Sequence, residues 1–481
     1  MALGRATARA ADDLDERLAP ARAVVDEAVR SDQVVYGITT GFGALATTHI
    51  GQPETEALQY NLLRSHATAV GDPLPDPVVR AMLLLRARTL AQGHSGVRPI
   101  IVRKLLELLG SGLLPVVPSQ GSVGASGDLA PFAHLALPLI GEGALRDANG
   151  MITEASHLEP VQLITKEGLS LLNGTEGMAA MGALALHHGR NLVAAADAAA
   201  AMTVEALLGS SRPFRPEIHA LRPHPGQVAS ARRIATLLAG SEIVESHAED
   251  FHHAVQDAYS LRCAPQVHGA VADTLDHMER VLVVEMGSVV DNPIVFPETG
   301  DVLSGGNFHG EPLAFVLDFA AIATSELASI SERRTDRILD PGRSQGLPPF
   351  LAAHPGVESG YMIAQYVSAA LVAENRVLAH PASVDSVPTS AGQEDHVSMG
   401  WGAGRKLLTI VENVRRVLAI EIMCAARGIE HRAPLRPASG TAALVELVRQ
   451  VVAPLEGDRS SSADIEAVAG LIESGAFASP I

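Results

Sequence analysis

One long apolar stretch constrains the fold more than any other feature. It runs from Met178 to Gly209 and reads MAAMGALALHHGRNLVAAADAAAAMTVEALLG. Its small and aliphatic residues recur at helical spacing, which predicts an α-helix that is buried on most sides. Five titratable residues interrupt it: His187, His188, Arg190, Asp197 and Glu205. A bilayer core tolerates such residues poorly, so we expect a long buried helix in a bundle and no membrane span.

The same periodicity recurs along the chain and predicts a mainly α protein. Residues rich in Ala, Leu, Met, Glu and Arg alternate with Gly, Pro and Ser clusters, and regular long strands are scarce. We expect helices over residues 12–30, 77–92, 100–109, 178–208, 226–238, 308–330, 363–379 and 398–427. Only 3% of residues are aromatic, which suits close helix packing in a long bundle.

Composition and charge limit the kinds of partner that the chain is expected to bind. The chain has 481 residues, 47% of them hydrophobic, and a formal net charge of −18, which argues against nucleic acid and anionic membranes as partners. Its two cysteines give neither a disulfide framework nor zinc-type spacing, and its first residues lack the apolar core of a signal peptide. We therefore expect a cytoplasmic protein that binds a small molecule.

No repeat or low-complexity linker divides the chain, so we expect a single catalytic domain over residues 1–481. Within it, we distinguish an N-terminal part (1–170), a central helical bundle (171–432) and a C-terminal helical tail (433–481). Within the tail, a polar loop begins near Gly457, and we expect a small surface helix to follow it.

The segment GSVGASGDLAPFAHL contains three residues that are able to make a cofactor from the backbone. If the Gly127 nitrogen attacks the Ala125 carbonyl carbon and Ser126 loses its hydroxyl as water, the product is a methylidene-imidazolone ring. Glycine suits the nucleophile because no Cβ blocks the approach. The ring is electrophilic, unlike any ordinary side chain. By itself, however, the tripeptide is more often an ordinary loop.

Other segments, in a fixed order, give the triad a context. VYGITTGFG, EGLSLLNGTEG, VQDAYSLRCAPQVHGA, LSGGNFHGEPLA, SERRTDR and SVDSVPTSAGQEDHVSMG all resemble signatures of the histidine, phenylalanine and tyrosine ammonia-lyases. The resemblance spans about residues 35–432. It implies the helical architecture of the ammonia-lyase and fumarase superfamily, the methylidene-imidazolone (MIO) group as the cofactor with no external one, and a homotetramer whose active sites draw on several subunits.

The resemblance also assigns roles to individual residues. Tyr36 in the glycine-rich VYGITTGFG segment would be the base that removes the substrate's β-proton, although a tyrosine near its usual pKa of about 10 needs donors or positive charge to do so. Asn173 would bond the ring oxygen or the substrate amine. Phe308 would pack against the ring. Without the resemblance, Tyr36 and Phe308 are more simply read as a turn anchor and a core residue.

A second group follows in VQDAYSLRC. Arg262 would hold the substrate carboxylate, because a guanidinium matches it with two parallel hydrogen bonds. Tyr259 and Gln256 precede Arg262 at intervals of three, so on a helix the three side chains would share one face. A solvated helix face would show the same spacing.

The chain also suggests its substrate. Ser65-His66 stands where the family pairs Ser-His with histidine, His-Leu with tyrosine and Phe-Leu with phenylalanine. Glu394, which the resemblance places among the catalytic residues, offers a carboxylate to an imidazole N–H, and a benzene ring would leave that carboxylate buried without a partner. Both favour L-histidine as the substrate, with urocanate and ammonia as products in histidine catabolism.

Four features depart from the histidine pattern. Thr39 gives the loop the sequence ITTGFG, Glu176 stands where Gln is common, and Gly392 replaces a bulkier residue. The VYGITTGFG segment, which contains Tyr36, also lies closer to the first residue than in family members. This would affect the ordering of that loop and the assembly of the protein.

Other functions remain open at this point. A tyrosine or phenylalanine ammonia-lyase and an aminomutase would use the same chemistry, and an inactive homologue would keep the fold alone. A metal hydrolase is the alternative of a different class, but His247, His252 and His253 lack the HExxH spacing, and we expect no metal.

Overall fold

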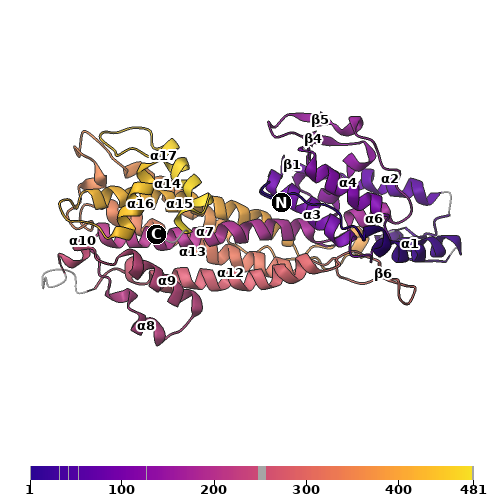
Figure 1. Cartoon of the computed structure of the whole chain (residues 1–481), viewed down its shortest axis with the longest axis horizontal. Coiled ribbons are helices and arrows are strands. Elements are labelled where there is room, and N and C mark those ends of the chain that lie inside the picture. The colour runs from indigo at the N-terminus through magenta and orange to yellow at the C-terminus, as the bar shows by residue number, and fades with distance from the viewer. Residues whose placement is uncertain are drawn as a thin grey trace. The chain divides into compact units, whose positions relative to one another are not determined.

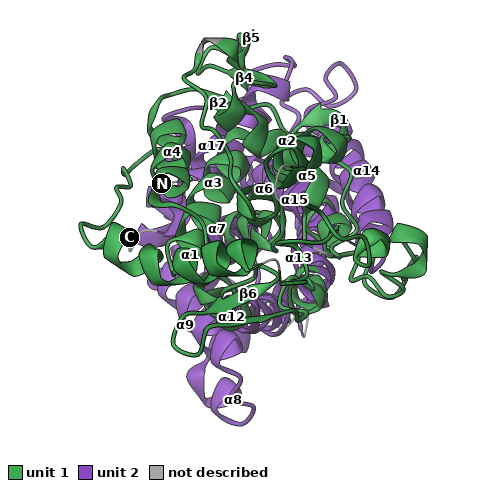
Figure 2. Ribbon diagram, turned by 90° about the vertical axis from the view of Figure 1, so that its right-hand side faces the viewer, with its two compact units in different colours: residues 1–184, 280–317, 382–405 green, residues 185–279, 318–381, 406–481 purple. Residues whose placement is uncertain are grey.

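The computed structural model describes the whole chain except residues 1, 32, 42, 52–53, 126, 248–255 and 479–481, and the side chain of residue 157 (Figure 1). Helices dominate the described residues, and the strands are two to four residues long. The prediction of a mainly α protein is confirmed. The chain forms two compact units (Figure 2): unit 1 comprises residues 1–184, 280–317 and 382–405, and unit 2 comprises residues 185–279, 318–381 and 406–481.

Unit 1 holds six helices that lie entirely within it, among the described residues. They are α1 (Leu14–Arg30), α2 (Thr55–His66), α3 (Asp76–Leu90), α4 (Pro99–Gly110), α5 (Leu129–Ala136) and α6 (Glu167–Leu172). Three small antiparallel sheets join them: β1 (Val70–Pro73) with β3 (Pro118–Gln120); β2 (Leu114–Pro115) with β4 (Ala144–Arg146) and β5 (Ile152–Glu154); and β6 (Ile294–Phe296) with β7 (Asp301–Leu303).

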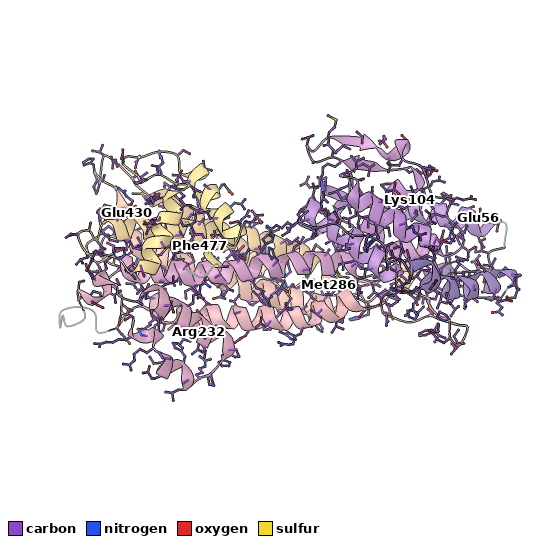
Figure 3. The ribbon with its side chains drawn as sticks, in the orientation of Figure 1. Glu56, Lys104, Arg232, Met286, Glu430 and Phe477 are labelled. Atoms are coloured by element: carbon purple, nitrogen blue, oxygen red, sulfur yellow. The ribbon has the colours of Figure 1, made fainter. Side chains whose placement is uncertain are left out.

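Unit 2 is helical throughout its described part. Its own helices are α8 (Pro216–Ala220), α9 (Pro225–Leu237), α10 (Glu242–Glu245), α11 (Tyr259–Arg262), α14 (Met362–Leu378), α16 (Ser439–Arg449) and α17 (Ser462–Glu473). The predicted tail helix is present as α17, and its apolar residues Ile465, Val468 and Ile472 are buried. The buried Phe477 (Figure 3) follows it, and its backbone carbonyl accepts a bond from Arg233.

Four long helices have residues in both units: α7 (Glu176–Ala206), α12 (Ala264–Gly287), α13 (Glu311–Leu339) and α15 (Gly400–Glu430). The predicted long buried helix is α7. Its polar residues are tolerated because they have partners: Asp197 accepts bonds from the His268 ring at 2.8 Å and from Ser230 at 2.5 Å, and Glu205 accepts one from Ser241.

Two expectations about long helices were wrong in part. Helix α12 was not predicted, although Leu275, Met278 and Leu282 lie buried at helical spacing, because its many β-branched residues weaken the helical signal. Helix α13 begins at Glu311 instead of residue 308, since Pro312 belongs in a first helical turn. It also continues to Leu339, beyond the predicted end at residue 330.

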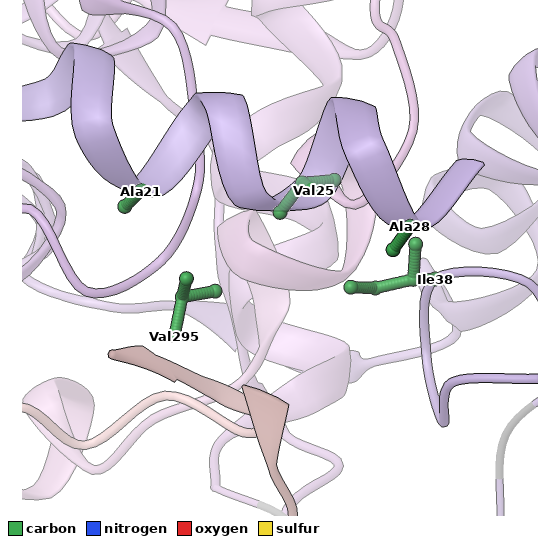
Figure 4. Packing of buried hydrophobic residues seen from close by; sticks show 5 residues of the cluster. All are labelled: Ala21, Val25, Ala28, Ile38 and Val295. Carbon is green, nitrogen blue, oxygen red and sulfur yellow. The ribbon is translucent and has the colours of Figure 1, made fainter. Parts of the chain in front are cut away.

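A cluster of buried aliphatic side chains holds in place the segment that contains Tyr36 and Ile38. Ala21, Val25 and Ala28 on one face of α1 pack with Ile38 and with Val295 of β6 (Figure 4). Each is at most 4% exposed. Burial of this kind contributes about 25 cal/mol for each Å² of apolar surface. Ile38 is therefore a rigid anchor two residues after Tyr36.

Among the described helices, α13 alone is long and apolar enough to cross a membrane by length and composition, with a mean hydropathy of 1.7 in its most apolar window. Within that window, 61% of the residues are buried inside the protein. Its charged end also pairs internally, with Arg334 bonded to Glu421 of α15 at 2.5 and 2.9 Å. These are the properties of a helix in a packed bundle.

Candidate active site

A cavity of about 530 Å³ lies within unit 1, and five of the predicted site residues line it. They are Tyr36, His66, Asn173, Phe308 and Glu394. Segments far apart in the sequence form the walls: residues 36–50, helix α2, the end of α6, and the loops around residues 292, 308 and 390–394. Of the fifteen other lining residues, eight are aliphatic and five carry polar side chains: Thr48, Asn61, Ser65, Asn292 and Ser390.

Tyr36 lies half-buried in a loop whose backbone is fixed on both sides. Its hydroxyl accepts a hydrogen bond from the Gly43 nitrogen at 3.4 Å. The Thr39 hydroxyl donates to the carbonyl oxygen of Gln33 at 2.5 Å and accepts from the Val35 nitrogen at 2.9 Å. Thr39 does not line the cavity. Its departure from the histidine pattern therefore changes how the loop is tied and leaves the cavity wall unchanged.

His66 ends helix α2 and is held in one orientation. Its Nδ1 lies 2.9 Å from the Leu62 carbonyl oxygen and 3.1 Å from the Ser65 hydroxyl oxygen. A carbonyl only accepts, so Nδ1 carries the proton and Nε2 of the neutral ring is an acceptor. Burial lowers the pKa of His66, while the bond to Leu62 and the charge of Glu394 oppose that shift. The neutral ring is therefore the favoured form at pH 7.

Glu394 closes a tight loop at the cavity edge. Thr389 and Glu394 pair through their backbones, and the Thr389 hydroxyl donates to Glu394 Oε2 at 2.5 Å. Between them, Ser390 and Ala391 have φ values of 50° and 55°, a conformation that residues other than glycine rarely adopt. Such backbone strain concentrates at functional sites. Gly392 continues the turn with a φ of 84°, which accounts for the absence of a bulkier residue there.

Asn173 follows the last residue of α6, at the helix-to-loop junction that the sequence predicts. Its Nδ2 donates to the Asn292 carbonyl oxygen at 3.0 Å. Its Oδ1 is buried and has no hydrogen-bond partner among the described residues. A buried acceptor without a partner is costly, so this oxygen is suited to an N–H group of a ligand in the cavity.

A buried ion pair lies next to the backbone of Asn173, and it was not predicted from the sequence. Arg86 of α3 is 0% exposed and pairs with Glu176, the residue that stands in place of Gln. The Arg86 Nη1 also donates to the carbonyl oxygens of Asn173 at 2.9 Å and Ser170 at 3.2 Å. The glutamate thus has a countercharge, and the arginine fixes the backbone that carries Asn173. The only sequence signal was the unusual Glu176.

Ser126 lies outside the described residues, but both of its neighbours are described. Ala125 is buried, and Gly127 has a φ of 75°. A Cβ on Gly127 would come within 2.2 Å of the Gly174 nitrogen and 2.3 Å of its oxygen, so only glycine fits. This close approach of two backbones at the residue that would supply the attacking nitrogen fits the formation of a backbone-derived ring.

Asp128 is a second residue of interest that the sequence did not single out, although it directly follows the triad. It is fully buried, and its Oδ2 accepts a bond from the Met178 nitrogen in the first turn of α7 at 3.0 Å. Its Oδ1 accepts one from the Ser122 hydroxyl at 3.0 Å. Burial raises the pKa of the Asp128 carboxyl to about 7, against the effect of these bonds.

The remaining predicted residues, Gln256, Tyr259 and Arg262, belong to unit 2. The expected shared helix face is wrong for Gln256, because α11 begins only at Tyr259 and Gln256 is exposed before it. The Arg262 guanidinium stacks on the Tyr259 ring at 4.5 Å, and its Nε donates to the Asp257 carbonyl at 3.0 Å. The Tyr259 side chain is 72% exposed.

Among the described residues, no group of three or more His, Cys, Asp or Glu side chains is arranged to hold a metal ion. His252 and His253, which suggested a metal hydrolase, lie outside the described residues. The cavity therefore offers hydrogen-bonding groups and no metal-ligand cluster in its described part.

The helical fold, with its cavity built from loops, is the fold of the helical ammonia-lyase class, which the following comparisons show. The sequence pattern of the family described as aromatic amino acid lyase matches residues 1–450, and the chain belongs to this family. The fold expectation is thereby confirmed, together with the resemblance that suggested it.

Individual relatives agree with this assignment. The chain is 55% identical to histidine ammonia-lyase of Deinococcus radiodurans over 466 residues, which cover 96% of this chain and 88% of the relative. Among solved structures it is similar to histidine ammonia-lyase from Trypanosoma cruzi (44% identity, TM-score 0.90, covering 99% and 91% of the two chains). It is also similar to tyrosine aminomutase from Streptomyces globisporus (37% identity, TM-score 0.93, covering 99% and 94%).

Proposed function

We propose that this chain is a histidine ammonia-lyase, which eliminates ammonia from L-histidine to give trans-urocanate, the first step of histidine degradation. The observation that carries the proposal is the presence of His66 and Glu394, two groups able to bond an imidazole, on one cavity. The 55% identity to a histidine ammonia-lyase over nearly the whole chain supports it.

The two groups suit an imidazole better than a benzene ring. His66 Nε2 and the Glu394 carboxylate are both acceptors. A neutral imidazole has one N–H to give to one of them, and an imidazolium has two. A phenyl ring would offer no N–H to either acceptor, and each hydrogen bond that is not made costs roughly 1–3 kcal/mol. The substrate choice thus follows from the penalty on the wrong ring as much as from attraction to the right one.

For the cofactor, the proposal is an MIO ring formed from Ala125, Ser126 and Gly127, with no external cofactor. The contact of Gly127 with Gly174, which excludes any side chain, supports it. When formed, the ring supplies an electrophile that makes the substrate amine a better leaving group, or acts on the substrate's own ring.

The residues of this chain then have the following proposed roles. Tyr36 removes the β-proton, with the Gly43 N–H as a donor to its oxygen. Asn173 uses its free Oδ1 to bind the substrate amine or orient the ring. Phe308 packs against the reacting centre, and Glu394 acts as a second proton-accepting group beside the imidazole. The aliphatic lining keeps water away from these groups.

Arg262 is the proposed ligand of the substrate carboxylate, assisted by Tyr259 and Gln256. We propose that they reach the substrate within a homotetramer whose active sites use residues of more than one copy. A stripe of exposed apolar residues on α14 supports association of copies: Ile363, Tyr366, Val367 and Val377. Such a tetramer would act in the cytoplasm.

Mixing two inactive variants tests the shared sites. Chains carrying Tyr36→Phe and chains carrying Arg262→Ala should each lack turnover, and co-assembly of both should restore part of it. Restoration requires that one complete site draws on two copies. If mixed assemblies of confirmed composition stayed as inactive as each parent, the proposal of shared sites would be wrong.

The direct test of the function is ultraviolet absorbance during incubation with L-histidine, L-tyrosine or L-phenylalanine. Growth of urocanate absorbance with L-histidine alone is the expected result. Growth with an aromatic substrate would keep the lyase chemistry and contradict the roles of His66 and Glu394.

An aminomutase is the second candidate, favoured by the similarity to tyrosine aminomutase in the whole fold. It would re-add the ammonia and release a β-amino acid. Chromatography of the same reactions distinguishes the two, because an aminomutase accumulates the β-amino acid whereas a lyase accumulates urocanate and free ammonia.

A further inference from the structure

A single hydroxyl group connects the residues on the two sides of Ala125-Ser126-Gly127. The Ser122 Oγ accepts a hydrogen bond from the Gly124 nitrogen at 3.0 Å and donates one to Asp128 Oδ1 at 3.0 Å. Gly124 is the residue before the triad and Asp128 is the residue after it. Ser122 thus connects the two flanks of the triad directly. Its hydroxyl proton is donated to Asp128, and one of its two lone pairs accepts from Gly124.

The downstream end of this connection is anchored to the protein. The Asp128 nitrogen donates to the Gly174 carbonyl oxygen at 2.8 Å, and its Oδ2 accepts from the Met178 nitrogen at 3.0 Å. Asp128 therefore cannot follow a movement of the turn, and the bond to Ser122 holds the turn to a fixed point.

The upstream end is anchored in the same way. The Gly124 carbonyl oxygen accepts bonds from the Gly310 nitrogen at 3.2 Å and the Ser398 hydroxyl at 2.9 Å. Ser398 is 1% exposed, so water does not compete for this oxygen. Ser398 belongs to the QEDHVSMG segment, of which the proposed function uses Glu394 alone.

Ring closure needs the turn to be compact. The nitrogen of Gly127 must touch the carbonyl carbon of Ala125, yet an extended chain advances about 3.3–3.6 Å with each residue and separates them. Gly124 and Gly127 both have positive φ, at 72° and 75°, which bends the chain on either side. Holding reacting atoms together in advance removes the entropic cost of their encounter.

The closure balances without an oxidant or reductant. The Gly127 nitrogen bonds to the Ala125 carbonyl carbon, and that carbonyl oxygen leaves as water with the amide protons of Gly127 and Ser126, which leaves a C=N bond. Ser126 then loses its hydroxyl and its Cα proton as a second water, which leaves the exocyclic C=C bond.

We propose that Ser122 is a positioning residue for this ring closure: its hydroxyl ties Gly124 to Asp128 and holds the triad in the compact turn from which the Gly127 nitrogen attacks. The proposal rests on the proposed function, since it requires the ring to form. Ser122 does not line the cavity, so its effect is on cofactor formation and not on substrate binding.

The experiment is intact mass spectrometry of freshly purified chains over time, with the Ser122→Ala and Ser122→Thr variants beside the natural chain. The natural chain should be lighter than its sequence mass by two waters. Ser122→Ala should close about tenfold more slowly, the effect of one lost hydrogen bond to a carboxyl group, and Ser122→Thr should restore closure. Ser111→Ala, which removes a hydroxyl of unit 1 that bonds the Leu108 carbonyl oxygen at the end of α4, is the control and should close normally.

Each outcome has a meaning. Equal closure in the natural chain and Ser122→Ala overturns the proposal. A natural chain without the mass deficit overturns both this proposal and the proposed cofactor. If Ser122→Ala fails to fold by circular dichroism, Ser122→Thr and its isostere Ser122→Val replace it, and equal closure in those two overturns the proposal. A closed fraction of Ser122→Ala that matches the natural chain in kcat and KM, although fewer chains are closed, supports it.

Discussion

Removal of the Glu176 carboxylate should destabilise unit 1 far more than removal of a surface carboxylate. Arg86 is 0% exposed and the Glu176 side chain 5%, so Glu176→Ala leaves an uncompensated guanidinium in the interior. Two carbonyl bonds, to Ser170 and Asn173, remain for Arg86, but neither carries charge. Loss of one member of a buried pair typically costs about 3–5 kcal/mol.

The assay is denaturant unfolding followed by tryptophan fluorescence. Trp401 is the only tryptophan in the chain, it is buried, and it packs against Gly177, the neighbour of Glu176. The matched control is Glu142→Ala, which breaks an exposed pair with Arg64 whose side chains are 52% and 37% exposed. That variant should lose about 0–1 kcal/mol.

A double-mutant cycle sharpens the test. Arg86→Ala and Glu176→Ala should each be strongly destabilising, while the double variant should cost less than their sum, because the second change removes a charge that the first left unpaired. The pair would not stabilise the backbone at Asn173 if Glu176→Ala lost no more stability than Glu142→Ala. The same conclusion would follow if the losses from Arg86→Ala and Glu176→Ala were additive.

Three further expectations concern the cavity and the triad. Thr389→Val should lower kcat/KM for L-histidine about tenfold by releasing the Glu394 carboxylate, and an unchanged value in steady-state assays would contradict the positioning of Glu394 by Thr389. His66→Leu should lower kcat/KM for L-histidine by at least about tenfold, whereas its value for L-tyrosine should not fall in parallel; parallel losses would refute a role in substrate choice. Because burial raises the pKa of Asp128 from 3.8 to about 7, its contribution to stability is fully present below pH 3.8 and is lost as pH rises through 7. Relative to Asp128→Asn, the natural chain should therefore lose roughly 3–4 kcal/mol between pH 4 and pH 8 in unfolding experiments, and a pH-independent difference would show that the carboxyl titrates normally.

Much of the helical architecture was readable from local pattern. Helix α7 was predicted from an apolar stretch whose periodicity extends over many turns, and α1, α3 and α4 from amphipathic runs of ordinary length. These signals are local, because residues three and four apart share a helix face whatever the rest of the chain does. Helix α12 was missed because its stability comes from packing, which the local residue preferences of Val and Gly do not announce. The prediction of one domain over the whole chain stays a prediction beside the two compact units.

For the candidate site, the sequence determined which chemical groups are present, and the tertiary structure determined which groups surround each of them. The motifs singled out Tyr36, His66, Asn173 and Glu394 as residue types suited to an amino acid substrate, and the family match agrees with that interpretation. Only the tertiary structure placed these groups on one cavity, chose the tautomer of His66, and left the Asn173 oxygen without a partner.

The supporting contacts could not be read from the chain at all. Arg86 and Glu176 are 90 positions apart, yet they form a buried pair, and Ser398 reaches a carbonyl 274 positions away. A lone buried charge or hydroxyl is unfavourable, so its partner is decided by how helices pack and not by its neighbours in sequence. Sequence therefore determined which groups are available for the reaction. Long-range packing alone decided where they are held, because burial and hydrogen bonding are properties of the assembled core.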